Sequence, residues 1–114
     1  MSGHVAAIIA AAGSGVRFGA DIPKALIQLG NRTLIEHAVA AISPTVDQVI
    51  VTAPASHLSQ FQSLLGDAVT VVVGGQTRSE SVRAGLAAVS SDTQYVLIHD
   101  AARPVVPKEV VERL

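Results

Sequence analysis

Four short apolar segments, separated by amphipathic stretches, give the chain a regular alternating pattern. The apolar segments are rich in Val, Ile and Ala, occupy residues 5–11, 47–52, 68–73 and 95–98, and have the length of buried strands. The stretches between them carry apolar side chains at helical spacing: Leu34, Ala38, Ala41 and Ile42; Leu58, Phe61 and Leu65; and Val82, Leu86 and Val89. This alternation predicts a Rossmann-like α/β fold, with a mostly parallel sheet, right-handed crossovers and helices on both faces.

Two segments carry signals for the ends of helices. Thr77 and Glu80 have the spacing of a capping box, which predicts that the third helix begins after Thr77, with Ser79 as the alternative N-cap. A further helix is predicted to begin at Pro107 and to reach Leu114 without a glycine or another C-cap signal. We therefore expect the chain to be truncated inside a helix.

The composition is that of an α/β domain and excludes several classes of protein. The 114 residues suffice for one domain, and the formal net charge of −1 gives no basic field for nucleic acid. The chain has no cysteine, which excludes disulfides, a thiolate nucleophile and cysteine metal sites. The longest apolar run, Val5 to Ala12, is too short to span a bilayer, and Met1–Gly13 lacks the charged start of a signal peptide. We expect a cytoplasmic protein that binds neither nucleic acid nor membrane.

A glycine-rich turn follows the first apolar segment. The run ends at Gly13, Ser14 and Gly15, and two cations follow, Arg17 and Lys24. Glycine permits backbone conformations that turn successive N–H groups inward, and such a nest of amides binds phosphate oxygens. The two cations would neutralise the charge that the amides leave. This order predicts a site for a polyanion, with a nucleoside triphosphate as the best-fitting ligand.

Two common phosphate-binding motifs do not fit this loop. A P-loop requires a Gly-Lys pair, which the sequence does not contain. The dinucleotide fingerprint requires a glycine where Phe18 stands, and an acidic residue after the second strand, where Ala53 and Pro54 stand. The alternative is an ordinary turn that uses its glycines only for backbone geometry. The cations that follow favour a phosphate site over that alternative.

Residues suited to ligand binding also follow the third and fourth apolar segments. Gly74 and Gly75 come after the third and Asp100 after the fourth. Ligands of open parallel sheets bind beyond the carboxyl ends of the strands, so we expect these segments and the glycine-rich turn to meet in one crevice. A carboxylate beside a triphosphate is repulsive unless a divalent cation lies between them, which favours Mg²⁺ at Asp100. The alternative is that Asp100 caps a turn, and His99 is interpreted as a hydrogen-bonded structural residue.

Three motifs resemble those of sugar-phosphate nucleotidyltransferases and, within them, the family of 2-C-methyl-D-erythritol 4-phosphate cytidylyltransferases. The motifs are A-A-A-G-S-G-V-R-F-G and P-K-A-L (between residues 10 and 26), G-G-Q-T-R-S-E-S-V-R-A-G-L (residues 74–86) and H-D-A-A-R-P (residues 99–104). The resemblance implies a fold of the nucleotide-diphospho-sugar transferase type. It also implies that residues 1–114 are the N-terminal part of a single nucleotidyltransferase domain whose remainder is missing.

The resemblance assigns roles to individual residues. It implies that Arg17 and Lys24 are the catalytic cations and that Asp100 helps to hold Mg²⁺. The nucleotide-binding residues that it implies are Ala11, Ala12, Gly13, Ser14, Gly15, Gly74, Gly75, Gln76, Ser81 and Ala101. The members of this set between residues 74 and 81 would surround the cytosine base. Position 76 is glutamine where many relatives have an acidic residue, a change without consequence if this position acts through its backbone.

The reaction implied by the resemblance is nucleotidyl transfer. CTP and 2-C-methyl-D-erythritol 4-phosphate would give the CDP-alcohol and pyrophosphate, a step in isoprenoid precursor biosynthesis. No general base is needed, because the acceptor phosphate is already an anion. Another catalytic lysine, a second metal-binding aspartate, the acceptor site and the arm that builds a homodimer would lie beyond Leu114. The alternatives are a ribitol-5-phosphate cytidylyltransferase and, for residues 1–114 alone, an inactive nucleotide-binding module.

Overall fold

The computed structural model describes residues 4–11, 24–101 and 112–113, with side chains for all of these except Lys24, Glu112 and Arg113. Its elements, in chain order, are β1 (His4–Ala10), η1 (Lys24–Leu26), β2 (Gln28–Leu29), β3 (Arg32–Thr33), α1 (Leu34–Ile42), η2 (Ser43–Thr45), β4 (Gln48–Ala53), η3 (Ala55–His57), α2 (Leu58–Leu65), β5 (Thr70–Val73), α3 (Arg78–Ala87), β6 (Thr93–Asp100) and β7 (Glu112–Arg113). In these ranges no helix combines the length and the apolar character needed to cross a membrane.

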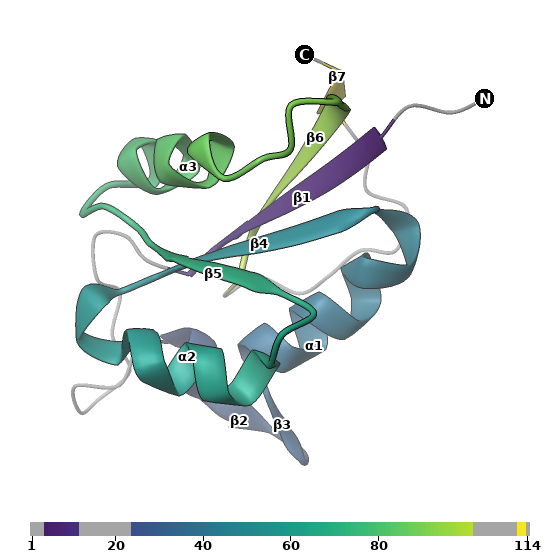
Figure 1. Cartoon of the computed structure of the whole chain (residues 1–114). Coiled ribbons are helices and arrows are strands. Elements are labelled where there is room, and N and C mark those ends of the chain that lie inside the picture. The colour runs from purple at the N-terminus through teal and green to yellow at the C-terminus, as the bar shows by residue number, and fades with distance from the viewer. Residues whose placement is uncertain (1–3, 12–23, 102–111, 114) are drawn as a thin grey trace.

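The main sheet has the strand order β5-β4-β1-β6-β7 (Figure 1). Strands β5, β4, β1 and β6 are parallel to their neighbours, whereas β7 is antiparallel to β6. The four apolar segments of the sequence correspond to β1, β4, β5 and β6. The predicted α/β fold with a mostly parallel sheet is therefore confirmed.

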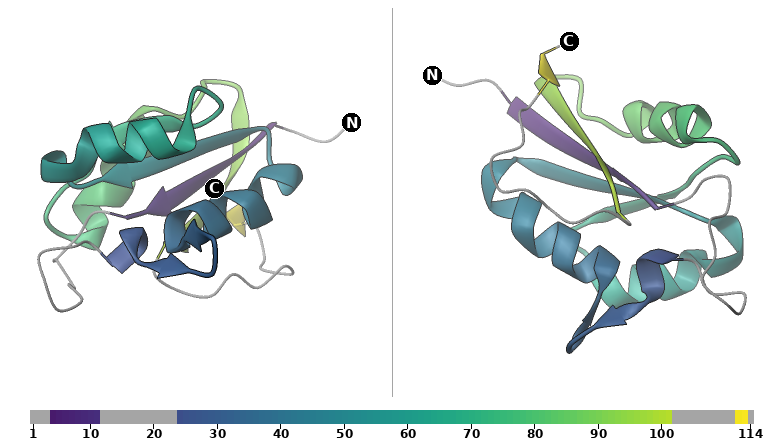
Figure 2. Two further views of the ribbon diagram at one scale, coloured as in Figure 1. Left: turned by 90° about the horizontal axis from the view of Figure 1, so that it is seen from below. Right: turned by 180° about the vertical axis from the view of Figure 1, so that it is seen from behind.

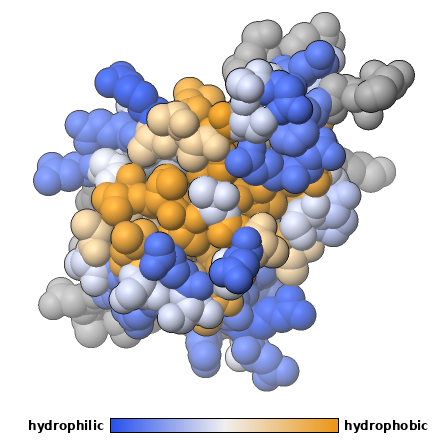
Figure 3. All heavy atoms as spheres, viewed as in Figure 1, coloured by the Kyte–Doolittle hydropathy of each residue, from blue (hydrophilic) through white to orange (hydrophobic). Residues whose placement is uncertain are grey.

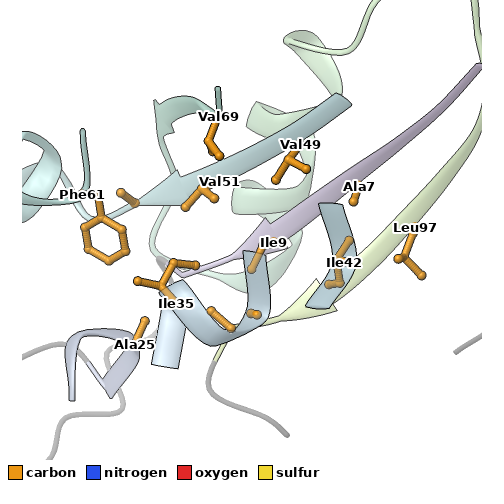
Figure 4. Close-up of a cluster of buried hydrophobic side chains, with 13 residues drawn as sticks. Ala7, Ile9, Ala25, Ile35, Ile42, Val49, Val51, Phe61, Val69 and Leu97 are labelled. Carbon is orange, nitrogen blue, oxygen red and sulfur yellow. The ribbon is translucent and has the colours of Figure 1, made fainter. Parts of the chain in front are cut away.

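Helices cover both faces of the sheet, as the sequence predicts. Helices α1 and α2 lie on one face and α3 lies on the other (Figures 1 and 2). The side chains of β1 alternate between two cores, with Ile9 in the larger core, shown in Figure 4, and Ile8 in the smaller core on the α3 face. Because β1 lies between β4 and β6, Ala6–Ala10 are buried, which explains why this segment is continuously apolar.

Helix α1 buries a row of side chains that differs in part from the predicted one. Its buried residues are Ile35, Ala38 and Ile42, whereas Leu34 is half-buried and Ala41 is exposed. The observed row has the i, i+3, i+7 spacing of a single helix face. The predicted row contained Ala38 and Ile42 but began one residue too early, so the orientation of the helix was wrong by less than a third of a turn.

A short hairpin that the sequence analysis missed leads into α1. Strands β2 and β3 are antiparallel, and Gly30 turns the chain between them with a φ of 72°. Thr33 then caps α1. Its hydroxyl accepts a hydrogen bond from the Glu36 N–H at 3.3 Å, and the Glu36 carboxylate accepts one from the Thr33 N–H at 2.8 Å. Thr33 and Glu36 have the same capping-box spacing as Thr77 and Glu80, so the sequence does contain this signal.

Helix α3 packs mainly through small side chains, and of the predicted apolar residues only Val89, just beyond the helix, packs against the smaller core in the described part of the chain. Its buried residues are Ser81 and Gly85. The apolar side chains of the predicted face remain half-buried or exposed: Val82, Leu86 and Val89. A Cβ atom at Gly85 would lie 2.6 Å from Cγ2 of Ile8, so glycine lets the helix backbone approach β1 closely. The prediction is wrong for Val82 and Leu86, because close backbone approach depends on side-chain size, which an apolar periodicity does not report.

The C-terminal part of the chain does not follow its prediction where it is described. Glu112 and Arg113, predicted within a helix, form strand β7, which pairs with Val96 and Tyr95 of β6. Backbone groups along the β6 edge give an extended segment hydrogen-bond partners there. The other residues of the predicted helix, 107–111 and 114, lie outside the described residues.

Polar contacts between neighbouring segments occupy the amino ends of the strands. The His4 Nδ1 atom lies 3.0 Å from Oγ1 of Thr93, which joins β1 to β6. The Ser90 hydroxyl donates a hydrogen bond to Asp92 and lowers the pKa of that carboxyl below its usual value. These groups stand at the end of the sheet opposite to Asp100, so their contacts belong to the scaffold.

Apolar side chains reach the surface along β5. Figure 3 shows them in the middle of the view, where β5 runs between α3 and α2. Helix α2 contributes the fully buried Phe61 to the larger core, with Leu58 and Leu65 packed beside it as predicted. The neighbouring Leu64 and Val73 remain 39% and 45% exposed. This surface borders the edge strand of the described sheet.

Replacing Gly85 with alanine should destabilise the protein, because the new methyl group would lie 2.6 Å from Cγ2 of Ile8, which is fully buried. Overpacking of this kind costs about 1–3 kcal/mol of unfolding free energy. Urea unfolding of Gly85→Ala, Ile8→Ala and the double variant measures the contact as a double-mutant cycle. With Ile8→Ala in place the clashing atoms are gone, so Gly85→Ala should then cost much less. An equal cost in both backgrounds would contradict the close packing.

Candidate functional site

The ends of the parallel strands bring the sequence-predicted segments together at one edge of the sheet. Ala11 follows β1, Gly74 follows β5 and Ala101 follows β6. Each of these residues continues the hydrogen-bond ladder one step past its strand. The Ala11 N–H donates to Thr52 O at 2.9 Å, and the Gly74 N–H donates to Ala53 O at 2.9 Å. On the other side of β1, the Ala101 N–H donates to Ala10 O at 3.0 Å. The described ends of β1, β5 and β6 therefore lie at one edge of the sheet, as expected, and the meeting of the glycine-rich turn with the other two segments in one crevice stays a prediction, because that turn lies outside the described residues.

A capping box holds the turn between β5 and α3. The Glu80 carboxylate accepts hydrogen bonds from the Gln76 N–H at 2.8 Å and from the Thr77 N–H at 3.2 Å, and the Glu80 N–H donates to Thr77 Oγ1 at 3.1 Å. Thr77 is therefore the N-cap, as predicted, and the alternative N-cap Ser79 is wrong. Because the Gln76 N–H already has a partner, the turn offers a ligand its carbonyl oxygens more readily than this amide.

Gly75 is required by the capping box itself. A Cβ atom at this position would lie 2.2 Å from Cβ of Glu80 and 2.8 Å from its Oε1. Real Cβ contacts are not this short, so any side chain at position 75 would displace Glu80 and release the amides that it holds. Gly75 thus has a structural role, in addition to the close approach to a base that the sequence analysis predicts.

Ser81 lies beneath the N-terminal turn of α3. It is fully buried, its hydroxyl donates to Gly75 O at 3.4 Å, and its N–H donates to Thr77 O at 3.0 Å. The structure therefore brings Ser81 and Gly75, two of the predicted base-binding residues, into contact. Gln76 adjoins them with an exposed side chain.

Asp100 ends β6 beside the last residue of β1. It pairs in register with Ala10, is half-buried, and is followed by the buried Ala101. Among the described residues, no group of three or more His, Cys, Asp or Glu side chains is suited to hold a metal ion. A Mg²⁺ ion typically takes one or two protein carboxylates and completes its shell with phosphate oxygens and water. A single carboxylate at this edge fits that pattern when a triphosphate supplies other ligands.

Two buried polar atoms at this edge have no hydrogen-bond partner among the described residues, namely Thr52 Oγ1 and His99 Nε2. A buried hydrogen-bonding group without a partner costs about 1–3 kcal/mol. The burial of His99 agrees with a structural role, but the expectation of a hydrogen-bonded ring is wrong for Nε2, which has no partner among the described residues. Thr52 was not identified from the sequence, where it reads as one more β-branched residue of a buried strand.

Part of the predicted site lies outside the described residues. These positions are Ala12, Gly13, Ser14, Gly15 and Arg17. Lys24 begins η1, and its neighbour Ala25 is buried in the larger core. The backbone at Lys24 is therefore anchored to the folded part of the chain.

Comparison with known proteins gives consistent results. A sequence model of the family described as 2-C-methyl-D-erythritol 4-phosphate cytidylyltransferase matches residues 5–114. The chain is 46% identical to the curated protein of that name from Rhodococcus opacus, over 98% of this chain and 50% of that protein. It is also similar to the crystal structure of 4-diphosphocytidyl-2C-methyl-D-erythritol synthase from Anaerococcus prevotii, with a TM-score of 0.73, 29% identity, and coverage of 90% of this chain and 45% of that one.

A third relative gives the same picture. The 2-C-methyl-D-erythritol 4-phosphate cytidylyltransferase from Thermus thermophilus has a TM-score of 0.66 and 34% identity, and the match covers 93% of this chain and 44% of that one. The chain spans about half the length of the curated relatives that it matches. The family match from residue 5 to residue 114 includes all three motifs and the described strands of the main sheet, except for His4 at the start of β1. The chain therefore belongs to the 2-C-methyl-D-erythritol 4-phosphate cytidylyltransferase family.

Proposed function

We propose that the protein of which these residues form the N-terminal part transfers a cytidylyl group from CTP to 2-C-methyl-D-erythritol 4-phosphate, in isoprenoid precursor biosynthesis. The observation that carries the proposal is the meeting of the segments after β1, β5 and β6 at one sheet edge, in a chain of this family. The described elements would form the nucleotide half of a single domain. The ribitol-5-phosphate alternative is not favoured, because the relatives reported above are named for the erythritol substrate.

The reaction needs positioned charge and no protein nucleophile. An oxygen of the acceptor phosphate attacks the α-phosphorus of CTP, a new phosphorus–oxygen bond forms, and the bond to pyrophosphate breaks. The acceptor oxygen is already anionic, so no proton has to be removed. Negative charge accumulates around the α-phosphorus, and preorganised cations in a site shielded from water stabilise it. Arg17 and Lys24 would supply this charge, and the backbone from Ala11 to Gly15 would cradle the triphosphate.

The base would bind beside the turn before α3. Because Glu80 already holds the amides of Gln76 and Thr77, the base would meet carbonyl oxygens of this turn in place of these two amides. A carbonyl accepts a hydrogen bond from the exocyclic amine of cytosine and repels the oxygen that uracil carries at the same position. The rejected base would leave buried groups unpaired, which is how such pockets discriminate.

Asp100 would hold a divalent cation, with Mg²⁺ as the expected ion. When bound, the ion would neutralise charge on the phosphate oxygens. The protein contributes a carboxylate fixed at the end of β6 by the pairing of Asp100 with Ala10 and by the following Ala101 N–H. Homodimer assembly stays a prediction of the family resemblance, and a cytoplasmic location stays a prediction from the sequence.

Removing either proposed cation should reduce turnover far more than it weakens CTP binding. In the full-length enzyme, Arg17→Ala or Lys24→Ala should lower kcat about 10²–10³-fold, because the lost charge acts on the transition state. Lys24→Arg should also be poor, since a planar guanidinium does not replace a compact ammonium. The control is Arg32→Ala, which removes an exposed cation from β3. Near-normal turnover in an alanine variant would exclude that residue from the mechanism.

Neutralising Asp100 should change the metal requirement. Asp100→Asn keeps the side-chain size and removes the charge, so the Mg²⁺ concentration needed for half-maximal activity should rise at least about tenfold. The matched control is Asp92→Asn, at the opposite end of the sheet. If Asp100→Asn and wild type titrate identically with Mg²⁺, Asp100 is a structural cap.

The base preference tests the proposed function directly. The full-length enzyme should use CTP far better than UTP or ATP when pyrophosphate release is followed with 2-C-methyl-D-erythritol 4-phosphate present. A pocket built to hydrogen-bond one base rejects a mismatched one by about 10²-fold or more. Comparable rates of pyrophosphate release with all three triphosphates would contradict the proposal that Gly74–Ser81 bind the base. Activity that requires ribitol 5-phosphate as the acceptor would contradict the proposal that 2-C-methyl-D-erythritol 4-phosphate is the substrate.

A further inference from the structure

The peptide bond between Gly75 and Gln76 is held at both of its polar ends by side chains of α3. Its N–H donates to Oε1 of Glu80 at 2.8 Å, and its carbonyl oxygen accepts from the Ser81 hydroxyl at 3.4 Å. The Thr77 N–H donates to the same Oε1 atom of Glu80 at 3.2 Å. A backbone N–H is a single donor, whereas a carbonyl oxygen has two lone pairs. The amides of residues 76 and 77 are therefore occupied, while a carbonyl that accepts one hydrogen bond can still accept another.

Two neighbours hold the Glu80 side chain against this turn. A Cβ atom at Gly75 would lie 2.2 Å from Cβ of Glu80 and 2.8 Å from its Oε1, so the glutamate side chain runs directly over Gly75. The Glu80 N–H donates to Thr77 Oγ1 at 3.1 Å, which fixes the backbone from which this side chain starts. The side chain itself is exposed and belongs to neither core of the sheet. Its replacement would therefore change the hydrogen bonds of the turn and leave both cores intact.

Cytosine and uracil need different hydrogen-bond partners along one edge of the ring. Cytosine carries an exocyclic amine, which donates, at the position where uracil carries an oxygen, which only accepts. A free backbone N–H beside the base would give that oxygen a partner and so would admit uracil. A turn whose amides are already occupied leaves the uracil oxygen buried without a donor, and such a mismatch lowers affinity. Specificity for cytosine can therefore come from the removal of a donor as well as from the presence of an acceptor.

We propose that Glu80 is a specificity-determining residue of the base pocket, which excludes uridine nucleotides by occupying the amides of Gln76 and Thr77. Glu80 is a positioning residue, because it acts on the base through the backbone of the turn and not through a contact of its own. Its effect needs an acceptor atom at the place of Oε1 and does not need a negative charge. This inference rests on the proposed function, because it needs a base beside the turn before α3.

The test compares CTP and UTP as substrates of the full-length enzyme and its Glu80 variants, with 2-C-methyl-D-erythritol 4-phosphate as the acceptor. Glu80→Ala frees both amides, so kcat/KM for UTP relative to kcat/KM for CTP should rise about 3–10-fold, the range expected for one hydrogen bond. Glu80→Gln keeps an oxygen that can accept from the same amides, so it should keep the wild-type ratio. Because both rates are measured on one preparation, partial unfolding of a variant does not change this ratio.

Glu36 provides the matched control. It forms the same kind of capping box with Thr33 at the start of α1, which lies on the other face of the sheet from α3 (Figures 1 and 2). Glu36→Ala should lower the melting temperature about as much as Glu80→Ala does and should leave the UTP-to-CTP ratio unchanged. The inference is overturned if Glu80→Ala keeps the wild-type ratio, or if Glu80→Gln or Glu36→Ala shifts the ratio as far as Glu80→Ala does. A wild-type enzyme that uses UTP as well as CTP would instead contradict the proposed function.

Discussion

The central position of β1 in the ladder fixes the geometry of the candidate site. Its last residue, Ala10, pairs with Thr52 on one side and with Asp100 on the other, so three strand ends share one register. The ladder continues past the strands through the N–H groups of Ala11 and Ala101. Parallel strands have no hairpin to set their register, so the pairing depends on burying the correct residues on each face. The positions of the segments at this sheet edge thus depend on β1, whose own side chains from Ala6 to Ala10 are apolar and buried.

Much of this arrangement could be predicted from the sequence, because it follows from strong and repeated signals. Each parallel strand is buried on both faces, so it reads as a continuous apolar run, as Val5–Ala12 does. Alternation of strands and helices leaves few possible topologies, and in all of them the strands end at one edge. That rule alone brought Gly74 and Asp100 to the same side of the sheet. The capping box at Thr77 was visible because its two residues act locally.

What the sequence could not predict depends on contacts between distant residues. The packing face of α3 is set by the approach of Gly85 to Ile8, which no property of either residue alone reports. Strand β7 exists because β6 offers it backbone partners, so the local pattern around Glu112 could not decide between helix and strand. The unpaired hydroxyl of Thr52 becomes visible only when the helix above it is in place.

The capping box before α3 has a consequence for how this segment evolves. Its hydrogen bonds join Glu80 to the backbone of Gln76 and to Thr77, and the Gln76 side chain takes no part in them. A substitution at position 76 therefore leaves the hydrogen bonds of the capping box intact. Position 75 is constrained to glycine, since a Cβ there would lie 2.2 Å from Cβ of residue 80, an atom that every residue except glycine carries. Among diverging homologues, position 75 should therefore stay glycine whichever side chain occupies position 80, while position 76 varies freely.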